Sequence, residues 1–199
     1  SAAGLNADLG AVTLMRARLE LEAEDWTAAL RLANSAYELF DQRGLLERQA
    51  QAELIRAHAT LALGRADEAS ELALSALSTS HKLQALPLSH AAHHLLARVA
   101  EERAQPERAQ DEYEAAIRDL ERVQTSLTTE LRTEFLGDKL RVFQDAIDHC
   151  LREGQIERGF GYLERAKSRA LVDYLASRPD VRVRASTARE QALIDELTH

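Results

Sequence analysis

Apolar residues recur at helical spacing along almost the whole chain and divide it into successive amphipathic segments. Side chains three and four residues apart lie on one face of a helix, and the second segment has this spacing at Trp26, Leu30, Ala33 and Tyr37. The pattern predicts helices over about 7–22, 46–63, 67–81, 106–127, 138–153 and 157–177. Two more are expected between Asp25 and Gly44 and from Pro87 onward. We therefore expect an all-α fold.

Capping and helix-breaking residues mark the ends of these segments. Asp25 can cap the second helix, and Gly44 ends it, because glycine is favoured just after a helix. Pro87 and Pro106 start the fifth and sixth helices, since a proline in the first turn loses no hydrogen bond. The end of the sixth helix stays open within residues 127–136, where poor helix formers give way to good ones.

The helical pattern repeats with a period of 40 residues. Three columns of alanine share this period: Ala17, Ala57 and Ala97; Ala29, Ala69 and Ala109; and Ala36, Ala76 and Ala116. Small side chains at matched places let paired helices approach closely. A turn position recurs at Glu24, Gly64 and Ala104, and a diverged fourth copy has Gly154, Gly159 and Ala166. This period predicts a solenoid of about four helix pairs, with units at about 5–44, 45–86, 87–127 and 138–178.

The repeat array is expected to cover residues 1–178 and to end at Pro179. Residues 181–184 alternate like a strand or extended linker, and residues 187–197 are expected to form one more amphipathic helix. Residues 179–199 would then be a linker and terminal helix leading to an absent downstream domain. Because an array cut at both ends exposes apolar faces, we also expect a homodimer through terminal helices, with candidate contacts at Leu193, Ile194 and Leu197.

Composition and charge exclude several classes of protein. The 199 residues include only 8 Gly and 3 Pro, in keeping with helices. Residues 1–129 carry 20 acidic and 13 basic side chains, and residues 130–199 carry 13 and 12, which leaves no basic stripe for nucleic acid. No apolar run could span a membrane, and no signal-like layout opens the chain. With Cys150 as its single cysteine, the chain has no disulfide framework, so we expect a cytoplasmic location.

The period and the turn sequence Leu63-Gly-Arg-Ala-Asp-Glu-Ala69 resemble tetratricopeptide repeats, in the longer variants of that family. Residues 132–176 resemble something narrower, the last repeat before the caspase-like protease domain of bacterial CHAT proteins. The similarity is greatest over residues 160–175, and Phe135-Leu136 and Val142-Phe143 match it in order and spacing. Gly159 and Gly161 depart from the family pattern, which has alanine or a larger residue there.

The resemblance implies a right-handed α-solenoid in which the protease domain, with its catalytic histidine and cysteine, would follow His199. The chain would then be the recognition and regulatory arm of a CHAT-type protein, a non-catalytic protein–protein interaction module. Long repeats of this type also resemble the sensor arms of transcriptional regulators, which is the alternative.

A candidate binding groove follows from the same resemblance, because the first helix of each tetratricopeptide pair lines the concave face. Equivalent places on these helices put Arg18, His58 and Arg98 in one column, with Asp148 in the fourth unit. Stacked basic side chains would favour a carboxylate or an acidic peptide. Leu21 and Leu61 would supply an apolar floor. The other interpretation is that all of these are ordinary solvated helix residues.

Histidines and the cysteine are the main candidates for chemistry. His90, His93 and His94 lie close together, and His90 with His94, four residues apart, could hold two corners of a zinc site. Zinc needs further ligands, and none stands at helical spacing nearby. We therefore expect exposed or capping histidines and no metal. Cys150 follows His149 directly, and consecutive helical side chains diverge by about 100°, so a buried thiol is expected rather than a nucleophile.

The remaining charged groups have simple structural interpretations. The acidic residues are expected on solvated helix faces, at Glu101, Glu102, Glu112 and Glu114. Lys167 and Ser168 share two letters with a phosphate loop but lie within a helix. Arg165, Lys167 and Arg169 are expected to pair with Glu164 or Asp173. No complete catalytic set can be assembled, so the chain is expected to be no enzyme, to bind no cofactor and to recognise a protein or peptide.

Overall fold

A computed structural model describes the backbone of residues 2–126 and 137–176, and side chains over 8–123 and 141–168. This part of the chain contains eight α-helices and no strand. They are α1 (Ala2–Glu22), α2 (Trp26–Asp41), α3 (Leu46–Ala62), α4 (Ala66–Leu83), α5 (Leu86–Glu102), α6 (Pro106–Ser126), α7 (Gly137–Arg152) and α8 (Ile156–Ala176). Over the described residues, the prediction of an all-α fold with these eight helices is confirmed. Apart from the start of α1 and the end of α6, which the sequence leaves open, the predicted ends agree within two or three residues.

The predicted turn positions share one conformation. Glu24, Gly64, Ala104 and Gly154 have φ of 60°, 77°, 52° and 69°, the left-handed region that favours glycine. Each turn repeats a pair of backbone hydrogen bonds: the N–H of Gly64 donates to Leu61 and that of the next residue to Thr60. The Asp25 carboxylate caps α2 by accepting from the N–H of Ala28 at 2.9 Å.

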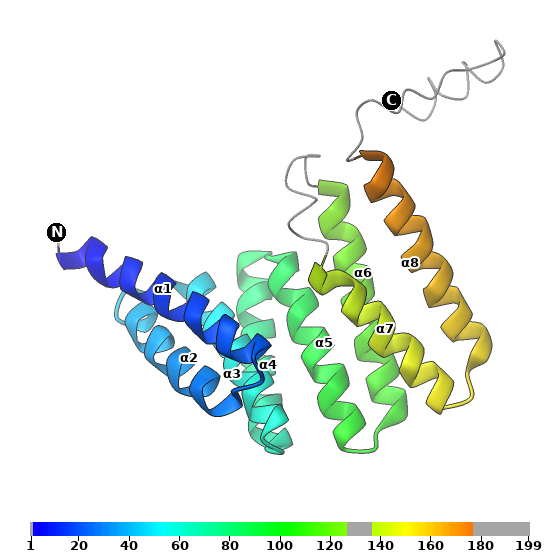
Figure 1. The fold of residues 1–199 in the computed structure, drawn as a ribbon, viewed down its shortest axis with the longest axis horizontal. Helices are drawn as coiled ribbons and strands as arrows, with labels where there is room; N and C mark the ends of the chain where they lie inside the picture. The colour runs from blue at the N-terminus through cyan, green and yellow to red at the C-terminus, as the bar shows by residue number, and fades with distance from the viewer. Residues whose placement is uncertain (1, 127–136, 177–199) are drawn as a thin grey trace, which may run out of the picture.

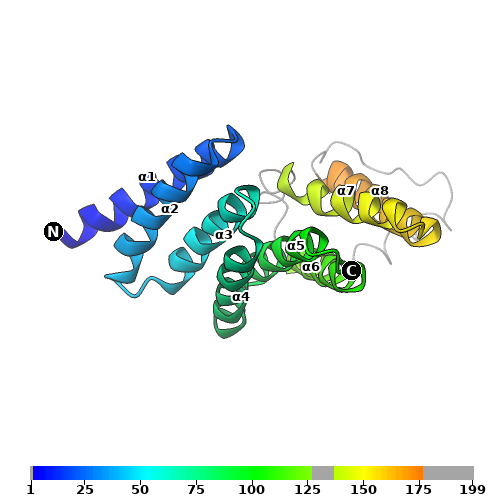
Figure 2. The same cartoon turned by 90° about the horizontal axis from the view of Figure 1, so that it is seen from below.

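The helices pack in chain order as antiparallel neighbours, and α3 also contacts α1 and α5. Figures 1 and 2 show the result, a row of helices running from α1 at one end to α8 at the other. The alanine columns lie where the helices meet, and all nine alanines are 0% exposed. Small residues at these places allow the close helix approach that the repeat predicted.

The apolar core extends along the row in successive clusters. The cluster between α5, α6, α7 and α8 centres on fully buried Tyr113, which takes the place of Ala33 and Ala73 in the earlier pairs. Phe143 on α7 packs into the same cluster. The α6–α7 interface is nevertheless much smaller than those between α2 and α3 or α4 and α5.

Several predictions fall outside the described residues. They are the end of the sixth helix within 127–136, the linker and terminal helix over 179–199, and the contacts assigned to Leu193, Ile194 and Leu197. Among the helices that the structure describes, none combines the length and apolar character needed to cross a bilayer.

Candidate partner-binding face

The four residues of the predicted groove column lie on the first helices of the four pairs, α1, α3, α5 and α7. Arg18 and Asp148 are exposed, whereas His58 and Arg98 are half-buried. The structure brings His58 and Arg98 together: the Arg98 guanidinium Nη1 lies 2.7 Å from His58 Nε2. Equivalent positions on neighbouring first helices are therefore in direct side-chain contact.

His58 is held neutral in this contact. Burial, reinforced by the charges of Arg98, His94 and Arg141, lowers the pKa of His58 to about 4, from an ordinary 6.5. Its Nε2 therefore accepts a hydrogen bond from the Arg98 guanidinium, whose positive charge is left uncancelled by this partner. The Trp26 ring lies 6.1 Å from the imidazole, centroid to centroid, and covers it from α2.

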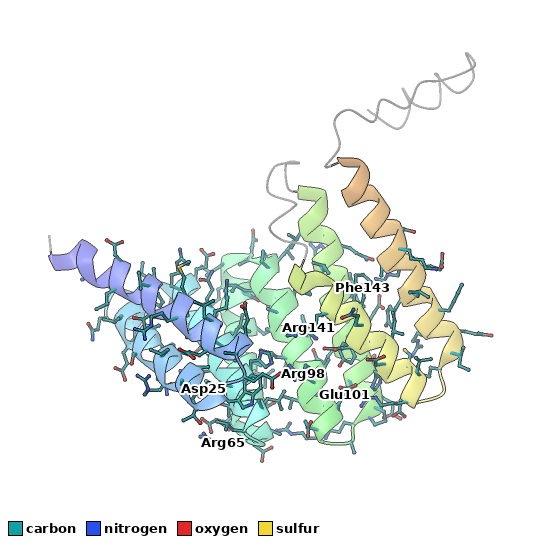
Figure 3. The ribbon with its side chains drawn as sticks, viewed as in Figure 1. Asp25, Arg65, Arg98, Glu101, Arg141 and Phe143 are labelled. Atoms are coloured by element: carbon teal, nitrogen blue, oxygen red, sulfur yellow. The ribbon has the colours of Figure 1, made fainter. Side chains whose placement is uncertain are left out.

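Three further side chains, one from α5 and two from α7, lie beside the contact between His58 and Arg98. His94, one turn before Arg98 on α5, places its Nε2 2.7 Å from Oδ2 of Asp145. Burial alone would raise the pKa of the Asp145 carboxyl, but the His94 hydrogen bond and the charges of His94, Arg98 and Arg141 outweigh it, so the pKa lies below its ordinary value. Arg141 is exposed; Figure 3 marks Arg98 and Arg141 on α5 and α7.

We call His58, His94, Arg98, Arg141 and Asp145 the arginine face. It joins α3, α5 and α7, with two guanidinium groups beside one carboxylate and a neutral histidine. Sequence reasoning missed the three residues that complete it. Regular spacing could have found them, because His94 lies four residues before Arg98, and Arg141 and Asp145 lie seven and three before Asp148. What spacing could not show is that α5 and α7 bring them together.

The two leucines predicted as the groove floor are in different surroundings. Leu61 is 6% exposed and packs with Ala69 and Val99, so it belongs to the core between pairs. Leu21 is half-buried against the cluster formed by α1, α2 and α3. Neither leucine therefore offers a fully open apolar floor.

The histidines of α5 correct the expectation of exposed or capping roles. His90 is 9% exposed, and its Nδ1 lies 2.9 Å from the Ala116 carbonyl. His93 is half-buried, with Nδ1 2.7 Å from Glu112 Oε2. Their partners come from α6, so helical spacing within α5 could not reveal them. Over the described ranges, no three or more His, Cys, Asp or Glu side chains converge as a metal-binding group.

Cys150 and His149 face different partners, as predicted from their adjacency. The Cys150 thiol is fully buried and donates to Gln110 Oε1 at 3.4 Å. Burial raises the pKa of this thiol, although Arg158 opposes the shift, so the reactive thiolate is disfavoured. His149 places Nδ1 3.0 Å from Glu101 Oε1 and Nε2 3.1 Å from the Pro106 carbonyl. The prediction of a buried thiol is confirmed.

Acidic residues predicted on solvated faces have structural partners instead. Glu101 is 19% exposed and binds both His149 and Arg152. Glu114 accepts from the Tyr162 hydroxyl at 2.9 Å and from Arg165. The expectation of fully solvated carboxylates was wrong here because helices distant in sequence bring cationic and hydroxyl groups against them.

Arg165 also has partners different from those expected. It binds Glu121 through Nε and Nη2, both at 2.9 Å, and Glu114 through Nη1. These bonds fix α8 to α6, which corrects the predicted pairing of Arg165 with Glu164. The side chains of Arg169 and Asp173 lie outside the described residues. Lys167 does pair with Glu164, at 3.2 Å.

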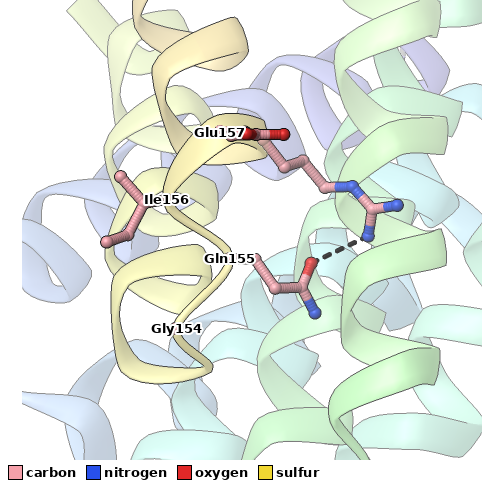
Figure 4. Close-up of a pocket in the computed structure, with 5 residues that line it drawn as sticks. Gly154, Gln155, Ile156 and Glu157 are labelled. Atoms are coloured by element: carbon pink, nitrogen blue, oxygen red, sulfur yellow. Dashed lines mark hydrogen bonds between the residues drawn. The ribbon is translucent and has the colours of Figure 1, made fainter.

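A shallow depression lies at the turn between α7 and α8 (Figure 4). It is lined by residues 154–158, and the Arg158 guanidinium donates to Gln155 Oε1 at 2.8 Å across it. The lining comes from one turn and brings no acid, base and nucleophile together. The arginine face is therefore the stronger candidate site in the described part of the chain.

Comparison with known proteins supports the architecture. The chain matches no protein-family model and no curated protein. Its structure resembles the crystal structure of BtubC (BKLC) from P. vanneervenii, with a TM-score of 0.64 and 18% sequence identity over 90% of this chain and 69% of that chain. At this identity the likeness shows the fold alone. The chain is a helical-repeat protein.

Proposed function

We propose that the chain is a non-catalytic protein–protein interaction module that binds an acidic peptide or protein segment on its arginine face. The observation that carries this proposal is the contact between His58 and Arg98. It aligns equivalent side chains of two successive first helices, and because His58 is neutral it does not cancel the Arg98 charge. Arg141 adds a second, exposed guanidinium on α7.

An incoming carboxylate would be recognised by charge-assisted hydrogen bonds. Guanidinium groups present several donors in a planar fork that fits a carboxylate, singly or in pairs. The Asp145 carboxylate offsets one of the two positive charges. Because Asp145 is hydrogen-bonded to His94, it is not a free acceptor. Exposed Asp148 lies in the same column on α7, so the row keeps one net positive charge only when Arg18 on α1 is included, and this charge favours acidic segments over basic ones. Arg18 on α1 would extend the same preference along the row.

We also propose that the array is a right-handed α-solenoid of tetratricopeptide type in a cytoplasmic protein, and that it is the recognition and regulatory arm of a CHAT-type protease-like protein. The shared turn conformation and buried alanine columns support the repeat type. The sequence resemblance over 132–176 supports the protease connection. Determining the parent sequence beyond His199 tests it. A domain with a catalytic histidine and cysteine would support it, whereas a DNA-binding domain would favour the arm of a transcriptional regulator.

The binding proposal is tested with a fluorescent peptide of alternating glutamate and leucine, compared with one of alternating lysine and leucine. Fluorescence anisotropy should show preference for the glutamate peptide, decreasing with salt. Replacing Arg18, His58 and Arg98 together by alanine should weaken binding at least about tenfold, since hydrogen bonds to charged groups contribute about 1.5–3 kcal/mol.

Single variants at exposed arginines separate binding from folding. Arg141→Ala should weaken binding, and Arg108→Ala on α6 should leave it unchanged, because both side chains are exposed but only Arg141 lies on the arginine face. Equal affinity for the two peptides, or unchanged affinity in both the triple variant and Arg141→Ala, would refute the proposal.

A further inference from the structure

Positions that the inner pairs bury are exposed on the outer face of α1. Val12, Met15 and Leu19 are 54%, 69% and 63% exposed. The equivalent positions one repeat later are buried on α3, at Ala52, Ile55 and Ala59, and again on α5, at Ala92, Leu95 and Val99. In those helices the preceding pair covers the face. The face of α1 thus has the character of an inner surface that no described helix covers.

The opposite end of the row shows the complementary feature. Leu163 on α8 is 37% exposed, whereas its equivalents in the first three pairs, Ala33, Ala73 and Tyr113, are all 0% exposed. Phe160 is 60% exposed, although its equivalents Ser70 and Gln110 are buried. Leu151, at the end of α7, is 56% exposed. These are positions that meet a following pair inside the array.

Contacts between inner pairs show which residues would meet if the row continued into a second copy. His58 contacts Arg98 in the next pair, so the same step places Asp148 opposite Arg18 of the second copy, two opposite charges. Tyr113 lies 5.7 Å from His149, ring to ring, so Leu163 would meet Leu19 of the second copy.

One more contact follows the same rule. Glu101 binds His149 in the next pair, and the equivalent step places Leu151 opposite Leu19 of the second copy. A polar pair inside the array thus becomes an apolar pair at the junction. The two ends are therefore complementary in charge and in apolar character. The contacts expected at the junction differ in chemistry from the equivalent contacts inside the array.

We propose that copies of this chain associate head to tail, with the α7–α8 end of one copy packing on the outer face of α1 in the next and continuing the repeat register. Such an interface is heterologous, so in a dimer each copy still has one unoccupied end. Association therefore continues past the dimer unless the rotation between copies closes a ring. The proposal does not depend on peptide binding by the arginine face.

Sedimentation velocity and light scattering over a range of concentrations test it. The mass-average molar mass of the wild-type protein should rise with concentration past the molar mass of a dimer. Leu19→Glu on one face and Phe160→Glu on the other should each weaken self-association about a hundredfold or more. The first places a charge in an apolar contact, and the second places a carboxylate opposite Glu20 of the second copy, which the contact of Gln110 with Cys150 puts against Phe160. Both positions are exposed in the single chain, so both variants should fold, which circular dichroism would verify.

Mixing the two variants gives the sharpest result. Leu19→Glu keeps an intact α7–α8 end and Phe160→Glu keeps an intact α1 face, so together they should form a heterodimer and nothing larger. Leu74→Glu, a matched change at an exposed leucine of α4, should associate like the wild type. Arg18→Asp should weaken association by about fivefold, the most that an exposed ion pair commonly contributes, and adding Asp148→Arg should restore it.

Three outcomes would overturn the proposal. A wild-type chain that stays monomeric throughout would show that the two ends do not bind each other. Self-association of Phe160→Glu alone would indicate a symmetric contact through α1. Failure of the two variants to combine, when both are folded and the wild type associates, would show that the two ends do not meet.

Discussion

A neutral histidine between helices gives the arginine face its chemistry at the scale of single residues. Protonated His58 would place a second positive charge 2.7 Å from the Arg98 guanidinium. Burial and this neighbour both oppose that charge. The folded state therefore keeps the imidazole as a hydrogen-bond acceptor, and this requirement makes stability depend on pH.

We predict that His58 destabilises the fold as the solution becomes acidic. The unfolded chain takes up a proton near pH 6.5, while the folded chain resists until about pH 4, so the unfolded state binds more protons in this window and the free energy of unfolding falls. The part of this loss in unfolding free energy that is due to His58 is at most about 3 kcal/mol.

The variant His58→Gln measures this share, because a neutral amide oxygen accepts from Arg98 at every pH. Urea unfolding at pH 7 and pH 5 should show a smaller loss of stability in His58→Gln than in the wild type. The difference between the two chains isolates His58 from the other histidines. Equal losses in both chains would contradict the neutral assignment.

The turn residues give a second prediction at this scale. Ala104 has φ of 52° and Gly64 has φ of 77°, in equivalent turns. The left-handed conformation costs a residue with a Cβ about 1–2 kcal/mol relative to glycine. Ala104→Gly should therefore stabilise the fold, by up to about 1 kcal/mol after the added chain entropy, and Gly64→Ala should destabilise it.

Urea unfolding of both variants checks the opposite signs. Nothing lies within 4 Å of a Cβ added at Gly64, so its effect reports the backbone alone. Two changes of the same sign would show that the turns are not equivalent.

The sequence was sufficient for these turns but not for the side-chain clusters. Glu24 and Ala104 could be placed by the period although neither is glycine, because the buried alanine columns fix the register. The left-handed residue Gln84, with φ of 53°, was not foreseen, although it lies one 40-residue period after Gly44, whose φ is 62°. The contact of His94 with Asp145 joins residues 51 apart and depends on how α7 packs, which no local pattern contains.

At the scale of helices, the fourth pair is attached differently from the first three. A small interface joins α6 to α7, and the pair gains its hold from the core around Tyr113 and from polar bridges. Arg165 ties α8 to α6 through two carboxylates, and His149 ties α7 to Glu101 of α5. Because exposed ion pairs contribute little, the buried apolar side chains should dominate this attachment.

The variant Phe143→Ala tests whether buried apolar side chains dominate the attachment of the fourth pair. Phe143 is 3% exposed in the shared core, and truncating a buried phenylalanine costs about 3–5 kcal/mol. Hydrogen–deuterium exchange should accelerate in α7 and α8 while α1 to α4 keep their protection, because no core cluster joins Phe143 to those helices. The matched change Phe160→Ala removes an exposed ring and should leave exchange unaltered within the monomer. Uniform acceleration over all eight helices would show instead that the chain unfolds as one unit.

At the scale of the whole molecule, contacts run between neighbouring helices, so a surface can extend along the row without closing into a deep pocket. The period predicted that successive helices pack as neighbours. It did not predict which first helices combine into one charged surface, because Arg141 and Asp145 lie in the diverged copy after a longer spacing. The arginine face results from the position of α7 beside α5.

We expect an acidic partner to bind this face rather than the outer surface of the second helices. Hydrogen–deuterium exchange with and without the glutamate–leucine peptide tests it most directly. We predict new protection in α3, α5 and α7 around His58, Arg98 and Arg141, and its loss in Arg141→Ala. Protection confined to α4, α6 or α8, unchanged in that variant, would contradict the account.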